Sequence, residues 1–235
     1  SRPGAAAIPE DLSGEQLFQY LHNNPAIAFN ISGSNTGYSA AKDYMYSRAD
    51  YVICNGAAGI ITSYSQICVN GSSDNGNDYT EKGDEDKDGV PGDFVNAEHI
   101  WPQGYFSSAY PMVADLHELA STFANPNSRR GNLRFAKVAS AVYSTSAGSR
   151  LGREGFEPAD AVKGNVARAM LYFIVRYYDR SIRQGMNYND FWTNRVPLLM
   201  EWNRRDPPDE NELLRNDLVE AFQNNRNPFI DNPAL

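Results

Sequence analysis

Apolar residues recur at steps of three and four along the second half of the chain, which is the spacing of one face of an α-helix. The longest run predicts a helix from 161 to about 183, and shorter runs predict helices over 190–202 and 210–224. We expect Pro197 to kink or break the second of these, because proline lacks a backbone donor and crowds the preceding turn. Helices therefore dominate the predicted second half.

The first half alternates shorter elements. A capping-box pattern, Ser13-Gly-Glu-Gln16, precedes a predicted helix that ends near Asn24. A second helix is predicted over 40–48, and strands are predicted over 51–54 and 59–69. The stretch 70–93 is rich in Gly, Asn, Asp and Ser and almost free of apolar residues, which predicts a loop or a series of turns.

The chain has 235 residues, 41% of them hydrophobic, which is enough apolar material for the core of one domain. We expect a single domain over 1–235 with a flexible N-terminal segment, residues 1–12. No run of eighteen apolar residues occurs, so we expect no membrane-spanning helix. The first residues lack the basic-then-apolar pattern of a signal peptide, and a leader removed before residue 1 stays an alternative.

The two cysteines, Cys54 and Cys68, enclose two glycines and a β-branched run, which is typical of a hairpin whose ends meet. A disulfide here would imply an oxidising compartment, whereas two buried thiols would fit a cytosolic protein. The pattern favours the disulfide but leaves both alternatives open.

The formal net charge of −8 argues against a polyanionic partner until its distribution is considered. Residues 1–98 carry fourteen acids and five bases, whereas residues 129–183 carry eleven bases and four acids. The asymmetry predicts a basic face on an acidic protein. The alternative is a set of ordinary solvated helix faces.

An acid and a histidine are adjacent in the stretch VNAEHIWP, as Glu98 and His99. A strand sends neighbouring side chains to opposite faces, so both can serve one site only where the strand ends, twists or bulges. Trp101-Pro102 predicts such an ending. Taken alone, the pair favours a histidine packed in the core.

Two downstream motifs change that interpretation. The segment DLHEL, residues 115–119, alternates like a short strand, and Asn125-Pro-Asn127 is a helix-start signal. An oxygen-rich site with one carboxylate and one amide oxygen would suit a hard cation such as Mg²⁺ and would suit zinc poorly.

Five ordered motifs resemble the bacterial endonuclease I family: NAEHIWPQ, DLHEL with NPNSRRGN, KGNVARAMLYF, WNRRDPPDENELLRND and NRNPFIDNP. Members are secreted or periplasmic nucleases of the His-Me finger (ββα-metal) superfamily. The resemblance implies a mainly helical α+β domain with a small antiparallel sheet, built around a ββα-metal core at 95–135.

The resemblance also implies residue roles. It makes His99 the general base that activates water, Glu98 and Asn127 the ligands of one Mg²⁺ or Mn²⁺, and Arg130 a phosphate contact or site organiser. It places His117 behind the site rather than at the reacting atoms. Asn132, Arg129 and Arg134 are further substrate or supporting candidates.

The chain departs from the family pattern in two places. Some members carry an insertion between the two motifs with an arginine that contacts the scissile phosphate, whereas the fifteen residues between His99 and Asp115 contain no arginine. We expect Arg129, Arg130 or Arg134 to supply that contact. Glu118 stands where the family often has asparagine.

A separate acidic motif, DEDKDG at Asp84–Gly89, begins like an EF-hand calcium loop. The twelfth position is Val95 rather than the bidentate glutamate of that loop. We keep two hypotheses: a structural Ca²⁺ site formed by Asp84, Asp86, Asp88 and Asp93, and a solvated flexible loop.

The sequence thus predicts a secreted or periplasmic, metal-dependent, non-specific endonuclease. It would act on DNA and RNA through phosphate contacts, leave 5′-phosphate and 3′-hydroxyl ends, and work as a monomer without membrane contact. Since such an activity endangers a cytoplasm, export and the disulfide are favoured together. The alternatives are a secreted calcium-binding or adhesion module without catalysis, and a zinc hydrolase using Glu98, His99 and His117.

Overall fold

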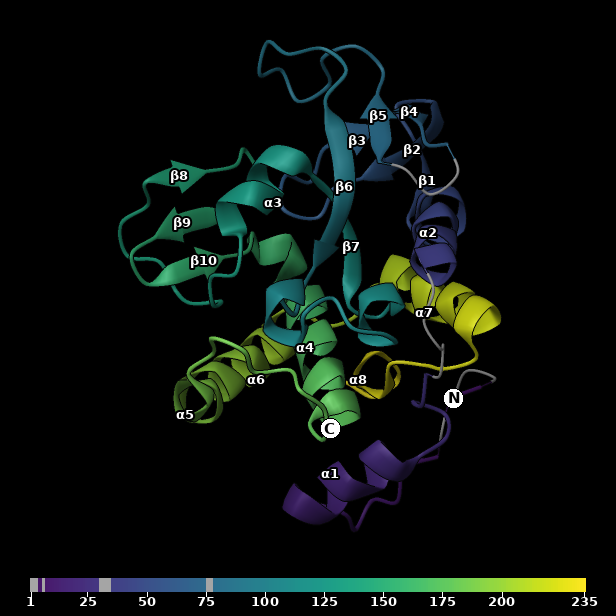
Figure 1. The fold of residues 1–235 in the computed structure, drawn as a ribbon, viewed down its shortest axis with the longest axis vertical. Helices are drawn as coiled ribbons and strands as arrows, with labels where there is room; N and C mark the ends of the chain where they lie inside the picture. Colours follow the sequence, from purple (N-terminus) through teal and green to yellow (C-terminus); the bar gives the residue numbers. More distant parts are fainter. Residues whose placement is uncertain (1–3, 6, 30–34, 75–77) are drawn as a thin grey trace.

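The computed structural model describes residues 4–5, 7–29, 35–74 and 78–235. Helices and small antiparallel sheets are mixed along the chain, which confirms the α+β class (Figure 1). The helices are α1 (Gly14–Asn23), α2 (Asn35–Tyr44), α3 (Ala124–Arg130), α4 (Lys163–Tyr177), α5 (Tyr188–Asp190), α6 (Val196–Arg205), α7 (Glu210–Gln223) and α8 (Pro228–Asp231). Short 3-10 or π segments are η1 (Met45–Ala49), η2 (Gln103–Phe106), η3 (Met112–Ala114), η4 (Asp160–Val162) and η5 (Phe191–Arg195).

The strands of the described residues form three sheets. One has the order β4-β5-β6-β7 and consists of β4 (Gly71–Ser72), β5 (Tyr79–Glu81), β6 (Phe94–His99) and β7 (Leu119–Phe123). The second consists of β1 (Tyr51–Cys54), β2 (Ala57–Ile61) and β3 (Cys68–Val69). The third consists of β8 (Tyr143–Ser144), β9 (Arg150–Gly152) and β10 (Gly155–Glu157).

Helix α4 forms the centre of the helical half. Its residues from Val166 to Tyr177 are all buried, because other elements cover the helix on every side. The ring of Trp101, just after β6, stacks on Phe173 at a centroid distance of 4.9 Å, and its indole N–H donates to the carbonyl of Ile182. The end of β6 is therefore anchored to α4, which fixes where the strand stops.

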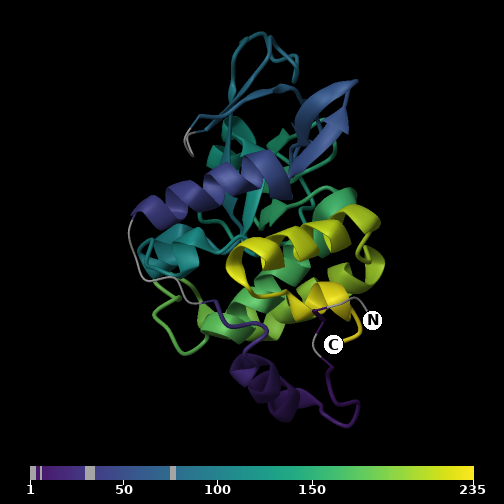
Figure 2. The same ribbon diagram turned by 90° about the vertical axis from the view of Figure 1, so that its right-hand side faces the viewer.

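The chain folds around one contiguous apolar cluster that extends from Leu21 to Phe229. Figures 1 and 2 show α1 at the end of the molecule opposite the long loop between β5 and β6. Among the helices of the described residues, none combines the length and the apolar character that a membrane crossing requires.

The predicted helices of the second half are largely confirmed. Helix α7 ends one residue before the expected Asn224, and Pro197 lies in the first turn of α6, directly after the π segment η5, so it marks a break. Helix α4 ends at Tyr177 rather than near 183. Ile182 continues the apolar spacing but is buried from a loop, which explains the overestimate.

The first half contains more corrections. Ser13 occupies the N-cap position of α1, but its side chain makes no capping hydrogen bond. The helix predicted over 40–48 is α2 continued by η1.

The strand predicted over 59–69 is divided by a turn, because Gln66 adopts a left-handed φ of 52°. The loop predicted over 70–93 contains β4 and β5, held by the buried ring of Tyr79. Residues 1–3 and 6 of the predicted flexible segment lie outside the described residues.

The Cys54–Cys68 disulfide is present, with the two Cα atoms 5.9 Å apart. It crosses β2 at Gly59, where a Cβ atom would lie 3.1 Å from the Cys54 sulfur and 2.6 Å from the carbonyl oxygen of Val69. Only glycine fits at this close approach. The predicted pairing is therefore confirmed, with a three-stranded sheet in place of a simple hairpin.

Candidate active site

Strands β6 and β7 form an antiparallel pair, and α3 follows β7 without a gap. His99 pairs with Leu119 and Glu98 with Ala120, so β6 ends where the sequence predicted. The second strand was predicted too early: β7 begins at Leu119, and residues 115–118 form a turn in which Asp115 accepts the backbone N–H of His117. This local side-chain bond competes with strand pairing.

One polar cleft of about 490 Å³ lies at this strand–strand–helix unit. Glu98 and His99 line it from β6, Asn127 from α3, and Asn132 from the segment after α3. Tyr38 of α2 closes another side. The structure therefore brings together the predicted base, both predicted metal ligands and one predicted supporting residue.

Glu98 is almost completely buried, and its carboxylate is held from one side. The hydroxyl of Tyr64 and a guanidinium nitrogen of Arg130 each donate to Oε1 at 2.6 Å. Burial raises the pKa of Glu98, and Arg130 and Tyr64 offset part of that shift. Both hydrogen bonds that the described residues make to this carboxylate end on Oε1, so Oε2 is the oxygen left for the cleft.

The Arg130 side chain, 1% exposed, organises the strand end. Besides Glu98, its guanidinium donates to the backbone carbonyls of His99, Ile100 and Leu133 at 2.8–3.0 Å. These interior acceptors occupy all three of its nitrogens. Of the two roles predicted for Arg130, these contacts match that of a site organiser. They leave little of the guanidinium to bind a phosphate.

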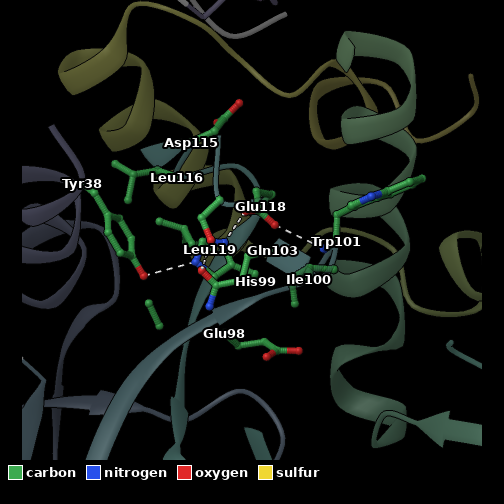
Figure 3. A network of polar contacts seen from close by, with 12 residues as sticks. Tyr38, Glu98, His99, Ile100, Trp101, Gln103, Asp115, Leu116, Glu118 and Leu119 are labelled. Carbon is green, nitrogen blue, oxygen red and sulfur yellow. Dashed lines mark hydrogen bonds and ion pairs between the residues drawn. The ribbon is translucent and has the colours of Figure 1, made fainter. Parts of the chain in front are cut away.

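His99 is buried between two partners, as Figure 3 shows. Its Nδ1 lies 2.6 Å from Glu118 Oε1, and its Nε2 lies 3.2 Å from the hydroxyl of Tyr38 (Figure 3). Burial, with Arg130 and Lys42 nearby, lowers the pKa of His99 to about 3, so the imidazole is neutral at pH 7. Burial and the neighbouring Asp115 raise the pKa of Glu118. Figure 3 also shows the Glu98 carboxylate and the His99 ring on different sides of the strand end.

Asn127, in the short helix α3, has a side-chain amide whose orientation is fixed by a hydrogen bond. Its nitrogen donates to the side-chain oxygen of Asn96 at 2.6 Å. An amide whose nitrogen is fixed in this way presents its oxygen on the opposite side. Asn96 was not singled out from the sequence, although the alternation of β6 places it on the same strand face as Glu98.

His117 lies outside the cleft, in a separate buried network. Its Nε2 contacts the backbone carbonyl of Asn225 at 3.0 Å, and its ring packs on Tyr172. Burial lowers its pKa. Among the described residues the structure does not bring Glu98, His99 and His117 together as the ligands of one metal, so it offers the zinc hypothesis no support.

The remaining predicted arginines are exposed near the site. Arg129 lies over the ring of Tyr143, and Arg134 donates to the carbonyl of Glu154 and forms an ion pair with Asp190. Both side chains can reach solvent. Which arginine contacts a phosphate stays a prediction.

The acidic loop lies before β6 and remote from the cleft. Its carboxylates converge in two overlapping sets, Glu81 with Asp84 and Asp86, and Asp86 with Asp88 and Asp93. Burial and neighbouring acids raise the pKa of Asp86 and of Asp93. Backbone N–H groups of the loop also donate to these side chains, for example those of Asp88 and Gly89 to Asp84. A structural Ca²⁺ ion stays a prediction.

No pattern in the sequence pointed to two tyrosines of the site. Tyr38 precedes β6 by more than fifty residues and reaches His99 from α2, and Tyr64 reaches Glu98 from the turn between β2 and β3. In the sequence, both tyrosines fit apolar patterns that are ordinary for a core and do not mark a site. Only the tertiary fold places their hydroxyls at the site.

Comparison with known proteins shows which family the chain belongs to. Residues 14–234 match the model of the Endonuclease I family. The chain is 37% identical over 155 residues to an extracellular ribonuclease of Bacillus amyloliquefaciens, covering 62% of this chain and 53% of the relative. It is 36% identical over 148 residues to an extracellular ribonuclease of Bacillus subtilis (strain 168), covering 59% and 51%. The chain thus spans about half the length of these relatives. Because the family model covers nearly the whole sequence, the chain belongs to the Endonuclease I family.

Proposed function

We propose that the protein is a metal-dependent endonuclease that hydrolyses phosphodiester bonds of DNA and RNA to 5′-phosphate and 3′-hydroxyl ends. One observation carries the proposal: a neutral histidine, a carboxylate and an amide line one cleft, while hydrogen bonds to the protein hold one side of each group. Such preorganisation is what a hydrolytic site requires.

The donor set fits a divalent cation. Glu98 Oε2 and the Asn127 side-chain oxygen are hard oxygen donors, and the hydrogen bonds to Glu98 Oε1 and to Asn96 prevent both groups from turning away. Mg²⁺ binds few protein oxygens and keeps several waters, so two ligands suffice. When bound, the cation would supply positive charge for a phosphate oxygen and the leaving 3′ oxygen.

His99 acts as the general base in this proposal. With its Nδ1 hydrogen donated to Glu118, the Nε2 lone pair faces the cleft, where the Tyr38 hydroxyl at 3.2 Å demonstrates room for a donor. A water in the cleft transfers a proton to Nε2 while its oxygen attacks phosphorus. The bond between phosphorus and the 3′ oxygen breaks, that oxygen takes a proton from solvent to become the 3′-hydroxyl, and the phosphate stays on the 5′ oxygen of the next nucleotide.

The relatives support the substrate class and the compartment. Both are named extracellular ribonucleases, and the Cys54–Cys68 disulfide is the kind of bond that persists in oxidising compartments. We therefore extend the proposal to an exported enzyme that accepts RNA as well as DNA.

The direct test uses purified protein with supercoiled plasmid and with single-stranded RNA. We expect nicking and RNA cleavage with Mg²⁺, none with EDTA, and nicks that a DNA ligase reseals because their ends are 5′-phosphate and 3′-hydroxyl. Cleavage that continues in EDTA, or RNA products with cyclic phosphates, would contradict the mechanism.

A matched pair of variants tests the metal ligand. Asn127→Ala removes the amide oxygen from the cleft, and we expect activity at low Mg²⁺ to fall by about 10- to 100-fold, with partial recovery at high Mg²⁺. Asn125→Ala, two residues earlier and exposed outside the cleft, is the control and should keep the activity of the unmodified protein. Equal activities in the two variants would remove Asn127 from the metal site.

A further inference from the structure

A second cavity, of about 370 Å³, adjoins the catalytic cleft. The two share Pro102 and Asn132 as lining residues, so this cavity lies directly beside the proposed base and metal ligands. Its walls come from the segment after α3, from the β9–β10 turn and from residues 185–199. None of the predicted catalytic steps requires this space.

The interior of the cavity is apolar and aromatic. Phe135, Phe191 and Leu199 are at most 2% exposed and form a fixed floor. The guanidinium of Arg130 covers one face of the Phe135 ring, 4.2 Å from its centroid, which holds that ring in place. Tyr105, on the same wall, is fixed by donating its hydroxyl to the carbonyl of Asn132 at 2.5 Å.

The rim of the cavity is cationic. The side chains of Arg134 and Arg153 are 52% and 93% exposed, and both line the cavity. With Arg195 they outnumber the two acids of the lining, Glu154 and Asp190, with which they form ion pairs. An apolar aromatic interior beneath a positive rim matches a nucleotide, whose flat base is apolar on its faces and whose phosphates are anionic.

Building on the proposed function, we propose that this cavity binds one unpaired nucleobase of the substrate, next to the scissile phosphate. The base stacks among Tyr105, Phe135 and Phe191, and its flanking phosphate meets the arginines at the rim. A base in a duplex can enter only by leaving its partner and its stack. The enzyme therefore prefers single-stranded nucleic acid, and it accepts any base because every base has an aromatic face.

A cleavage ladder tests the proposal on the unmodified enzyme. The probe is an end-labelled single-stranded homopolymer of about 20 nucleotides with one abasic residue in its middle, cleaved in Mg²⁺ under single-hit conditions. Every phosphate is reported by its own band. We expect cleavage to fall about fivefold or more at one of the two phosphates flanking the abasic residue, and to stay within about twofold at the other, since stacking of one base on aromatic side chains is worth at least about that factor.

Two matched methionine variants test the cavity itself. Met186 is half-buried in its lining, and Met186→Trp fills the space with a larger side chain. Met200, equally half-buried on α6, lines neither the cavity nor the cleft, so Met200→Trp is the control. We expect the unmodified protein and Met200→Trp to cleave a single strand about tenfold faster than the matching duplex, and Met186→Trp to lose most of that preference. Melting temperatures verify that both variants are folded.

The outcomes separate the two proposals. A uniform ladder across the abasic residue overturns the base-binding cavity even if Met186→Trp does not fold, because this result needs no variant. Mg²⁺-dependent cleavage that persists alongside it leaves the proposed function intact. An absence of Mg²⁺-dependent cleavage on every substrate overturns the proposed function and this inference with it.

Discussion

Two buried histidines each lie beside a carboxylate of the turn 115–118, and they face different parts of the protein. His99 with Glu118 faces the cleft, whereas His117 with Asp115 faces the helical core. All four side chains are at most 4% exposed. Burial alone therefore does not distinguish the pair that we assign to catalysis from the pair that holds the fold.

The core pair is saturated with hydrogen bonds. Asp115 accepts from the hydroxyls of Tyr172 and Tyr177 at 2.6 Å and from the Gln223 amide at 2.7 Å, in addition to the backbone of His117. The backbone carbonyl oxygen of Asn225 contacts the Nε2 atom of the His117 ring. This network ties the turn to α4 and to α7, and it has no atom directed at a substrate.

The cleft pair faces a side chain that lines the cleft. Nδ1 of His99 lies 2.6 Å from Glu118, which also accepts the backbone N–H of Trp101, and Nε2 of His99 meets the Tyr38 hydroxyl at the longer distance of 3.2 Å. A site for chemistry needs a reactive atom that faces the substrate. The difference between the pairs is thus where Nε2 faces: a cleft-lining hydroxyl for His99 and a backbone carbonyl of the core for His117.

The largest predicted effect compares His99→Ala with His117→Ala. Loss of the general base should lower kcat by about 10²- to 10⁴-fold in His99→Ala, with a melting transition that is still cooperative. His117→Ala leaves a hole in the core and should lower the melting temperature while kcat, measured well below it, stays within about threefold. Plasmid nicking and thermal unfolding measure the two quantities.

The reverse result would reject the assignment of roles. If His117→Ala lost activity while fully folded, or if His99→Ala kept it, the cleft-facing ring nitrogen would not identify the base. Because both variants remove an equally buried imidazole, each serves as the control of the other.

The sequence predicted the parts of this comparison that depend on local pattern. The end of β6 at His99, the start of a helix near Asn127 and the helix over 210–224 each rest on signals within a few residues: an aromatic–proline stop, a helix-start motif and apolar periodicity. The Cys54–Cys68 bond followed from spacing and a glycine-containing turn. Local rules were sufficient there because neighbours in sequence set the geometry.

The rest depended on contacts between distant segments. Tyr38 and Tyr64 reach the site from other elements, and the guanidinium of Arg130 turns inward to three backbone carbonyls. No spacing rule distinguishes a buried arginine from one that faces a phosphate. The turn 115–118 was predicted as a strand from the mixture of apolar and polar residues in DLHEL, although its polar side chains make the decisive contacts.

Asp115→Asn tests the saturation of the core pair. An asparagine of the same shape offers one acceptor oxygen where the carboxylate offered two, so at least one tyrosine hydroxyl or the Gln223 amide loses its buried partner. We expect the free energy of unfolding to fall by about 2 to 5 kcal/mol. Asp43→Asn, exposed on α2, should change it by less than about 0.5 kcal/mol. Denaturant unfolding of both variants measures the difference, and equal stabilities would show that the network contributes little.

Glu118→Gln tests the single anchor of the cleft pair. The glutamate accepts from both His99 and Trp101, but a glutamine carries one oxygen and one NH₂ group, so one of these donors loses its acceptor. The imidazole of His99 then loses either the contact that orients it or the carboxylate charge that favours the tautomer with hydrogen on Nδ1. We expect kcat to fall about tenfold with KM nearly unchanged, because the bound substrate does not touch Glu118, which is fully buried behind the ring. Glu15→Gln, exposed on α1, is the control. A change confined to KM would mean that Glu118 shapes the cleft rather than positioning the base, and it would leave the cleft-facing Nε2 of His99 as the feature that distinguishes the two pairs.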